Sequence, residues 1–372
     1  MDNLVKRTWA EISIKNIENN YRCLRSALPS GVGLMGVVKA DSYGHGAVPV
    51  SLRLQELGCE YLAVTTIDEA SELRENGITL PILILSPTPP ECACELADLD
   101  LTQAVGDIAM ARELSSRLNE ASKKLKIHIK LETGMGRTGF TADDRSALDE
   151  VLELLNLPCL EAEGIFSHFA VSEIADDSFN EEQFSRFGAA VDFLRKESGH
   201  SFKYKHCSNS GAVINFKKYS LNMVRPGLAL YGMYPGSNME DIGLLPAMEL
   251  KTRVAAITKH KKGDTISYGR TYTVPHDMKF AVLPIGYADG LHRILSNNMS
   301  VLINGKRAPQ IGRICMDMCM ADVSGIPDCK VGDVATVFGI DPSADELAEK
   351  AGTINYEIVC SVSKRVPRVY VY

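Results

Sequence analysis

The sequence predicts an α/β protein, a (β/α)8 TIM barrel followed by a mostly β C-terminal domain. Over roughly the first 230 residues, strand-like and helix-like runs alternate with a period of about 25 to 30 residues, the rhythm of a TIM barrel. After Gly236, strand-like runs follow one another at short spacing, which is typical of a β barrel or sandwich. We expect the barrel at 13–240 and the β domain at 241–372, joined by an N-terminal strand within 1–12.

The barrel elements are read from hydrophobic periodicity. A strand at Thr8–Ile14 and a helix from Ser13 to Leu28 come first. The later strand-like runs are Val32–Val38, Tyr61–Val64, Ile82–Leu85, Leu101–Val105, Ile127–Leu131, Leu160–Phe166, Tyr204–His206 and Asn222–Leu230. The helix-like runs between them are Ala47–Leu57, Ile67–Asn76, Cys92–Leu96, Asp107–Lys124 and Glu181–Lys196. A doubly wound open sheet is the main alternative, but no G-x-G-x-x-G sequence follows the first strand to support its dinucleotide-binding form.

The β domain is read in the same way, with turn signals such as Asn304-Gly305 between its strands. Its expected strands are Glu249–Thr258, Thr265–Val274, Lys279–Pro284, Met299–Ile303, Gln310–Val323, Val334–Phe338 and Glu357–Val366. One helix is expected at Ala344–Ala351.

Composition excludes several classes of function. The formal net charge of −7 offers no basic field for nucleic acid or an anionic membrane surface. No apolar run approaches the roughly 20 residues of a membrane-spanning helix, and the first residues lack the apolar core of a signal peptide. The ten cysteines include no Cys/His set for zinc, so we expect no metal, reduced thiols and a cytoplasmic protein.

Lys39 follows the apolar run Leu34–Val38, which resembles a buried parallel strand. The carboxyl ends of such strands carry the chemistry of α/β folds. An amine desolvated at this edge is a nucleophile toward aldehydes or a general base. The alternative is a lysine whose charged end reaches solvent from a strand end.

Further polar clusters follow the later strands of the predicted barrel. They are Lys130 to Arg137, His168, His206 with Asn209 and Ser210, and Arg225 with Gly227. The last two strands of such barrels commonly hold a phosphate through backbone N–H groups and a hydroxyl. A phosphate site on one side and a strand-end lysine on the other suit pyridoxal phosphate bound through a Schiff base.

Lys130 is unusual because a lysine that faces into a barrel is costly unless it is paired. Arg137 pairs with Lys130 only if the amine becomes anionic, for instance by carbamylation. The alternative is that Lys130 points outward.

These residues lie within motifs that resemble the bacterial alanine racemase family, fold-type-III pyridoxal phosphate enzymes, over essentially the whole chain. In the barrel region the motifs are VVKADSYGHG from Val37, KLETGMGRTGF from Lys130, GIFSHFA from Gly164, HCSNSGA from His206 and MVRPGLALYG from Met223. In the β region they are ISYGRTY from Ile266, PIGYADG from Pro284, GRICMDM from Gly312 and INYEIVC from Ile354.

The resemblance implies a homodimer whose active sites are shared between chains and which interconverts L- and D-alanine for peptidoglycan. Lys39 would be the Schiff-base lysine and one acid/base group, and Tyr268 of the partner subunit would be the second, on the opposite face of the substrate. His168 and Arg225 would connect Tyr268 to the pyridine nitrogen. The remaining implied residues are Tyr43, His206, Asn209, Ser210, Gly227 and Leu228 for the cofactor, and Arg137, Met316, Tyr287 and Lys130 for the substrate.

Lys364 departs from the family, which usually has a tyrosine there that reaches the cofactor phosphate. A lysine still offers the phosphate a point charge, and it leaves room beside the substrate for a hydroxymethyl group. Serine, or both alanine and serine, is therefore an alternative substrate; Lys364 directed to solvent is the other interpretation. From other classes, a non-catalytic pyridoxal phosphate carrier would lack the β domain and Tyr268, and a decarboxylase would pair the ring nitrogen with an acid rather than with Arg225.

Overall fold

The computed structural model describes residues 6–174 and 176–372. The chain divides into two compact units, which we describe one at a time. The barrel unit comprises Ile17–Ser42 and Ala47–Leu245, and the β unit comprises Met1–Asn16, Tyr43–Gly46 and Pro246–Tyr372. The predicted N-terminal strand corresponds to β1 (Thr8–Ser13), and residues 1–5 of that prediction lie outside the described residues. The predicted boundary between a cofactor-binding barrel at 13–240 and a β domain at 241–372 stays a prediction.

The described part of the barrel unit contains one parallel sheet with the neighbour order β10-β2-β3-β4-β5-β6-β8-β9. In that order the strands are Met223–Val224, Gly33–Val37, Tyr61–Val64, Ile82–Ile84, Leu101–Val105, Leu125–Glu132, Leu160–Phe166 and Tyr204–His206, and β7 (Phe140–Thr141) pairs with β6. Just beyond the two end strands, the amide of Arg225 donates to the carbonyl of Ser208 at 2.8 Å, so β10 and β9 approach each other. The predicted TIM barrel is confirmed.

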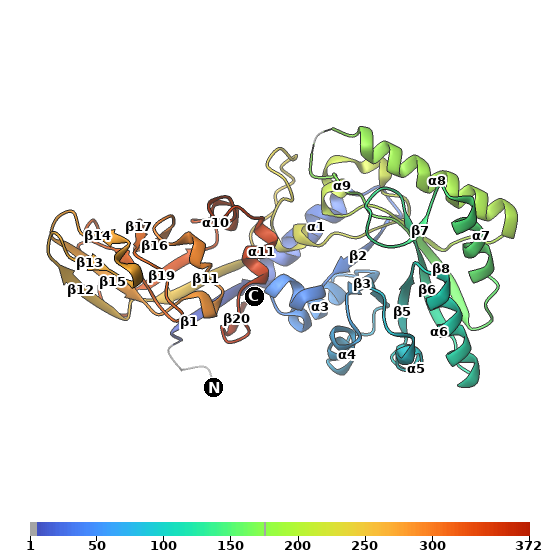
Figure 1. Cartoon of the computed structure of the whole chain (residues 1–372), viewed down its shortest axis with the longest axis horizontal. Coiled ribbons are helices and arrows are strands. Elements are labelled where there is room, and N and C mark those ends of the chain that lie inside the picture. Colours follow the sequence, from blue (N-terminus) through green and yellow to red (C-terminus); the bar gives the residue numbers. More distant parts are fainter. Residues whose placement is uncertain (1–5, 175) are drawn as a thin grey trace. The chain divides into compact units, whose positions relative to one another are not determined.

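Helices follow the strands around the outside of this barrel (Figure 1). They are α1 (Ile14–Ala27), α3 (Ala47–Glu56), α4 (Ile67–Glu75), α5 (Ala93–Asp98), α6 (Ile108–Glu120), α7 (Arg145–Leu154), α8 (Ser178–Ser198) and α9 (Ser210–Asn215). The short segment α2 (Lys39–Gly44) follows β2. Short 3-10 turns are η1 (Pro90–Cys92), η2 (Lys217–Tyr219) and η3 (Leu228–Tyr231). We did not predict α7, although Asp144 caps it and its buried Leu148, Val151 and Leu154 recur at helical spacing.

The described β unit contains a sheet with the order β12-β15-β18-β17-β16-β19-β11-β1-β20. Beyond β1, its strands are β11 (Met248–Arg253), β12 (Ala256–His260), β15 (Met278–Leu283), β16 (Ser300–Ile303), β17 (Lys306–Ile311), β18 (Cys319–Asp322), β19 (Val334–Phe338) and β20 (Arg368–Val371), and β13 (Thr265–Ile266) pairs with β14 (Tyr272–Thr273). The helical segments are η4 (Tyr268–Arg270), η5 (Tyr287–Asp289), η6 (Arg293–Leu295), α10 (Ala344–Ala351) and α11 (Asn355–Cys360). The mostly β domain is confirmed, and Phe280, Met278 and Ile311 lie in its core.

The strand predicted at Glu357–Val366 is wrong, because this stretch begins as helix α11 and continues without a strand. The helix buries Asn355, Ile358 and Val359, and the buried Val362 just beyond it continues the spacing of the same helix face. The β-branched Ile-Val pair suggested a strand, but burial on one helix face outweighs that local preference. β20, which pairs with β1 in parallel, was not predicted.

Three other predicted strands are interrupted. Thr265–Val274 breaks at Ser267–Thr271, and Gln310–Val323 breaks between Ile311 and Cys319. Glu249–Thr258 is two strands, because β11 pairs with β1 and β19 whereas β12 pairs with β15. The first break contains Tyr268 and the second contains Met316, so two of the predicted site residues lie in turns that interrupt the predicted strands.

Candidate active site

Lys39 follows β2 and opens a turn with left-handed backbone angles. The φ angles of Ala40, Asp41 and Ser42 are 52°, 53° and 53°, a conformation that costs non-glycine residues roughly 1–2 kcal/mol each. Glu69 stabilises the turn, because one carboxylate oxygen accepts from the amide of Ala40 at 2.6 Å and the other from the amide of Thr65 at 2.7 Å. Strain maintained in this way is characteristic of functional positions.

Arg225 follows β10 and is 4% exposed. Its Nη1 contacts His206, donating to Nδ1 at 2.5 Å and to the carbonyl at 3.0 Å. Its Nη2 donates to the carbonyl of Ser167 at 2.7 Å and lies 3.2 Å from Nδ1 of His168. The hydrogen bonds of Arg225 to the described residues all come from Nη1 and Nη2, so a bound molecule can use its Nε–H. Burial lowers the pKa of Arg225 to about 10, which leaves it cationic near neutral pH.

Cationic side chains surround His168, which follows β8. Burial lowers the pKa of His168 well below its usual value, and Arg225, Arg137, Lys130 and Lys39 lower it further. The imidazole is therefore neutral. A group of cations around a neutral histidine suits an anionic ligand such as a phosphate or a carboxylate.

Lys130 lies on β6 and is 6% exposed, so the interpretation that it points outward is wrong. Its Nζ donates to the carbonyl of Leu131 at 2.8 Å and lies 5.5 Å from the centre of the Phe166 ring. Burial, followed by the nearby Arg225, lowers its pKa to about 8. It also lines a mainly apolar cavity of about 610 Å³ with residues that include Leu85 and Met110. A neutral amine is thus accessible to Lys130 near physiological pH, as carbamylation requires.

Ser210 lies between the two last strands of the barrel and is buried. Its hydroxyl oxygen accepts from the amides of Gly227 at 2.9 Å and Ala229 at 3.2 Å, at the start of η3. Asn209 caps α9 by accepting from the amide of Ala212 at 3.1 Å. A buried hydroxyl beside the backbone N–H groups at the start of η3 fits a phosphate, and the Nε–H of Arg225 fits a ring nitrogen. These residues therefore fit pyridoxal phosphate.

The other predicted site residues lie in the β unit. Tyr268, on η4, is 72% exposed, while Tyr287 and Met316 are 44% and 53% exposed. Two backbone hydrogen bonds join the segments that carry Tyr287 and Met316. The amide of Tyr287 donates to the carbonyl of Cys315 at 3.0 Å, and the amide of Ala288 donates to the carbonyl of Met316 at 3.0 Å. Tyr43 is buried, and its ring centre lies 6.0 Å from that of Tyr356. Exposed aromatic side chains on ordered turns suit a surface that another chain covers.

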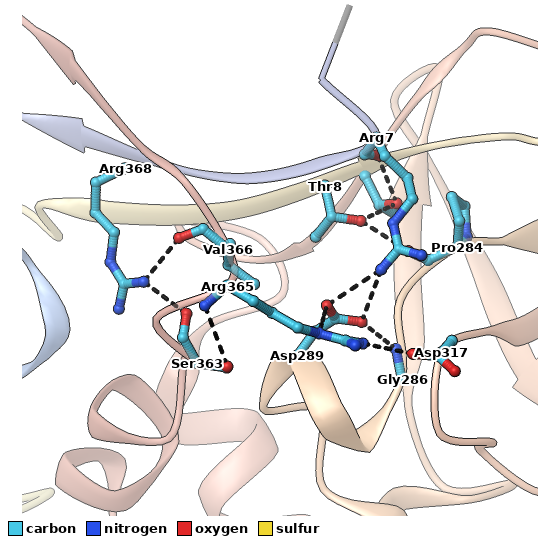
Figure 2. A network of polar contacts seen from close by, with 11 residues as sticks. Arg7, Thr8, Pro284, Gly286, Asp289, Asp317, Ser363, Arg365, Val366 and Arg368 are labelled. Atoms are coloured by element: carbon cyan, nitrogen blue, oxygen red, sulfur yellow. Dashed lines mark hydrogen bonds and ion pairs between the residues drawn. The ribbon is translucent and has the colours of Figure 1, made fainter.

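Arginine and aspartate side chains hold the segment around Lys364 (Figure 2). Asp289, 1% exposed, accepts from Nε of Arg365 at 2.8 Å and from the amide of Gly286 at 2.9 Å. Arg365 also donates to Asp317 at 2.8 Å. The network therefore connects three segments, those that carry Lys364, Met316 and Tyr287, whereas the Lys364 side chain itself is exposed.

The barrel unit brings together the predicted residues Lys39, Lys130, Arg137, His168, His206, Asn209, Ser210, Arg225, Gly227 and Leu228. Tyr43, Tyr268, Tyr287, Met316 and Lys364 belong to the β unit. We did not predict Glu69 or His128, whose Nδ1 lies 2.9 Å from Nε2 of His206. The alternation around His128 puts it on the same strand face as Lys130, and this signal could have identified it.

The buried histidines predict that the protein is sensitive to acid. Burial lowers the pKa of His128, and it lowers that of His206 well below its usual value. The unfolded chain binds protons below about pH 6.5 that these two rings do not bind in the fold, so stability is complete above that pH and falls below it. We expect the free energy of unfolding to fall by roughly 1 kcal/mol per pH unit for each ring, measured by urea unfolding from about pH 7.5 to 5.5. An unchanged free energy over this range would contradict the buried neutral state.

The model of the alanine racemase N-terminal domain matches residues 12–235, and that of the C-terminal domain matches residues 247–370. "Alanine racemase 2" of Caldanaerobacter subterraneus subsp. tengcongensis is 44% identical over 99% of this chain and 96% of the relative. Among solved structures, alanine racemase of Clostridium difficile 630 in complex with cycloserine has a TM-score of 0.94 at 37% identity, covering 99% of this chain and 96% of that one. Alanine racemase from Bacillus anthracis with bound L-Ala-P has a TM-score of 0.92 at 38% identity, covering 99% of this chain and 96% of that one.

Within the described residues, no helix is long and apolar enough to cross a membrane. Among the same residues, no group of three or more His, Cys, Asp or Glu side chains is placed to hold a metal ion.

Proposed function

The chain belongs to the alanine racemase family, and on that premise we propose how its own residues interconvert L- and D-alanine. It is an amino-acid racemase that depends on pyridoxal 5′-phosphate. The observation that carries the proposal is the buried Arg225, in contact with two histidines, at the same strand ends as Lys39. This arrangement favours a racemase over a decarboxylase, for which we expected an acidic partner of the ring nitrogen.

The residues of the barrel unit would hold the cofactor. When bound, pyridoxal phosphate supplies an electron sink for the negative charge that develops at the substrate Cα. Ser210 and the amides of Gly227 and Leu228 would bind its phosphate, with Tyr43 and Lys364 as further ligands. Asn209 orders the turn that presents Ser210, and His206 orients Arg225. Arg225 would donate its Nε–H to the ring nitrogen, which therefore stays unprotonated.

Racemisation removes a proton from one face of Cα and returns one to the other, so it needs two groups on opposite faces. We assign these roles to Lys39 and to Tyr268 of the partner subunit. Tyrosine is a weak acid with an ordinary pKa near 10, so it needs neighbours that tune it. The neutral His168, which lies 3.2 Å from Arg225, is the neighbour that we assign to it.

The substrate carboxylate would be bound by Arg137 and by the backbone of Met316, and Tyr287 would narrow the entrance. The neutral amine of Lys130, whose pKa is about 8, would add to carbon dioxide and release a proton to water, and the resulting carbamate would pair with Arg137. Three of the assigned residues, Tyr268, Tyr287 and Met316, are exposed in the β unit. Their exposure supports a homodimer in which this surface is covered by a second copy. We further propose a cytoplasmic enzyme that supplies D-alanine for peptidoglycan.

A second activity, on serine, is favoured by Lys364. A tyrosine at this position would fill space beside the substrate Cβ, whereas a lysine is less rigid and leaves room for one more heavy atom. An unpaired buried hydroxyl costs about 1–3 kcal/mol, so a partner for the serine hydroxyl affects the rate by about one to two decades. The backbone on either side of Lys364 is held by Arg365 and Arg368, so a substitution there changes the side chain with little change of the loop.

We therefore expect measurable racemisation of serine beside that of alanine. The substitution Lys364→Tyr is expected to raise the ratio of kcat/KM for alanine to that for serine by about tenfold or more, mainly by slowing serine. Kinetics with L-alanine and L-serine in parallel measure the ratio, and Lys364→Met separates the loss of charge from the added ring. A ratio that stays within about twofold of the original would show that specificity is determined by other residues.

A further inference from the structure

A chain of polar side chains leads from Arg225 into the interior of the barrel. Arg225 contacts Nδ1 of His206 at 2.5 Å, and Nε2 of His206 lies 2.9 Å from Nδ1 of His128. Nε2 of His128 lies 3.6 Å from Oε1 of Glu163. Both histidines have no exposed surface. In an interior that is otherwise mainly apolar, these four side chains form a continuous path between a cation and an anion.

The direction of both hydrogen bonds in this chain, from Arg225 to His206 and from His206 to His128, follows from Arg225. A guanidinium only donates, so Nδ1 of His206 accepts and its proton lies on Nε2. Nε2–H of His206 then donates to Nδ1 of His128, whose proton must lie on its own Nε2. That proton points toward Glu163. Partial burial raises the pKa of Glu163, but the nearby His128, 3.6 Å away, and the hydrogen bond from the hydroxyl of Tyr61 lower it more, so the carboxylate is ionised.

The pairing of β6 with β8 determines the position of Glu163. The register of β6 against β8 shifts between Ile127 and His128, which pair with Ala162 and Gly164, so Glu163 is the extra residue of a bulge. Bulges redirect side chains, and here the carboxylate accepts from the hydroxyl of Tyr61 at 3.0 Å. A Cβ on Gly164 would lie 2.4 Å from Cδ2 of His128, so only glycine leaves room for this ring.

Arg225 has no carboxylate of its own among the described residues, although it is buried. We propose that Glu163 is a positioning residue, which through His128 and His206 fixes the imidazole tautomers and so holds Arg225 with its Nε–H free for the cofactor ring. Without the carboxylate that lies 3.6 Å from Nε2 of His128, the second tautomer of that ring becomes equally favourable. Its Nδ1–H would then oppose Nε2–H of His206, and the contact with Arg225 would weaken. The proposal rests on the proposed function only for the role of Arg225.

The test combines side-chain ¹⁵N NMR of the histidines with kinetics, in the cofactor-free and the cofactor-loaded protein. In the unmodified protein we expect the proton of both His128 and His206 on Nε2. The variants are Glu163→Leu, which removes the acceptor, and Glu163→Gln, which keeps an acceptor without the charge. The matched control is Glu161→Leu on the same strand, because Glu161 is exposed and pairs with Lys124 at 3.5 Å.

We expect Glu163→Leu to mix the tautomers of His128 and to lower kcat for alanine about tenfold while KM stays within about twofold, because substrate contacts are unchanged. Glu163→Gln should keep the tautomers and most of kcat, and Glu161→Leu should change neither. A proton on Nδ1 of His206 in the unmodified protein would overturn the proposal even if a variant failed to fold. So would unchanged tautomers in Glu163→Leu, or a kcat in Glu163→Gln as low as in Glu163→Leu. Absence of racemisation in the unmodified protein would refute the proposed function, while the NMR of the cofactor-free protein would still test the chain.

Discussion

Lys39→Ala is expected to abolish racemisation, lowering kcat for alanine by a factor on the order of 10³ or more. The substitution removes both the amine that links to the cofactor and one of the two proton-transfer groups. Borohydride reduction of the unmodified, yellow protein should attach the cofactor permanently to the peptide that contains Lys39. Conversion of L- to D-alanine measures the first result, and mass spectrometry of the digested protein measures the second.

The matched control is Lys126→Ala. Lys126 lies on barrel strand β6 and pairs with Asp100 at 2.9 Å, so its loss removes one surface ion pair and should leave kcat within about twofold. Cofactor attached to Lys130 or to another lysine would disprove the assignment of Lys39. The left-handed turn after Lys39 gives the assignment a structural basis, because a strained backbone held by Glu69 keeps the amine at the strand end.

Mixing inactive Lys39→Ala protein with inactive Tyr268→Phe protein is expected to restore activity. If each site uses Lys39 of one chain and Tyr268 of the other, one of the two sites in a mixed dimer keeps both groups. Random exchange makes half of the dimers mixed, so the recovered activity should approach about a quarter of that of the unmodified protein. The exposed position of Tyr268, at 72%, is consistent with a role outside its own chain.

Two measurements make the result of this mixing experiment decisive. Tyr268→Phe alone should remain about 10² to 10⁴-fold slower than the unmodified protein, the range for loss of one acid/base group, and Lys39→Ala alone about 10³-fold slower or more. Native mass spectrometry of isotope-labelled chains should show that subunits exchange under the conditions of mixing. No recovery in spite of exchange would place Lys39 and Tyr268 of the same chain in one site.

Much of the fold was predictable because its signals are local. Val32–Val38 and Leu101–Val105 are short apolar runs between helix-like stretches, and such runs identify buried parallel strands without further information. Asn304-Gly305 identified the hairpin between β16 and β17, where the φ angles are 48° and 73°. The failures arose where local preference and burial disagree. α11 contains Ile358 and Val359, which favour strands, yet it is helical because these two side chains and that of Asn355 are buried at helical spacing.

The residues of the candidate site could be predicted from the sequence, but the contacts between them could not. The motifs placed Lys39, His168, His206 and Arg225 at strand ends, and parallel strands bring their carboxyl ends together. The sequence did not indicate the left-handed run from Ala40 to Gly44, because only its last residue, Gly44, is a glycine. A contact between His128 and His206 joins two strands 78 positions apart and depends on the register of the whole sheet.

The sequence by itself determined the class of fold, the order of the two regions and the identity of the residues available for chemistry, because periodicity, turn residues and motifs are written along the chain. Only the tertiary structure decided which of these side chains are buried and what they contact. Burial lowers the pKa of Lys130 to about 8 and keeps His206 neutral, and both shifts require surroundings assembled from distant strands. The bulge at Glu163 also depends on the tertiary structure, because β8 has an extra residue only in relation to its pairing with β6.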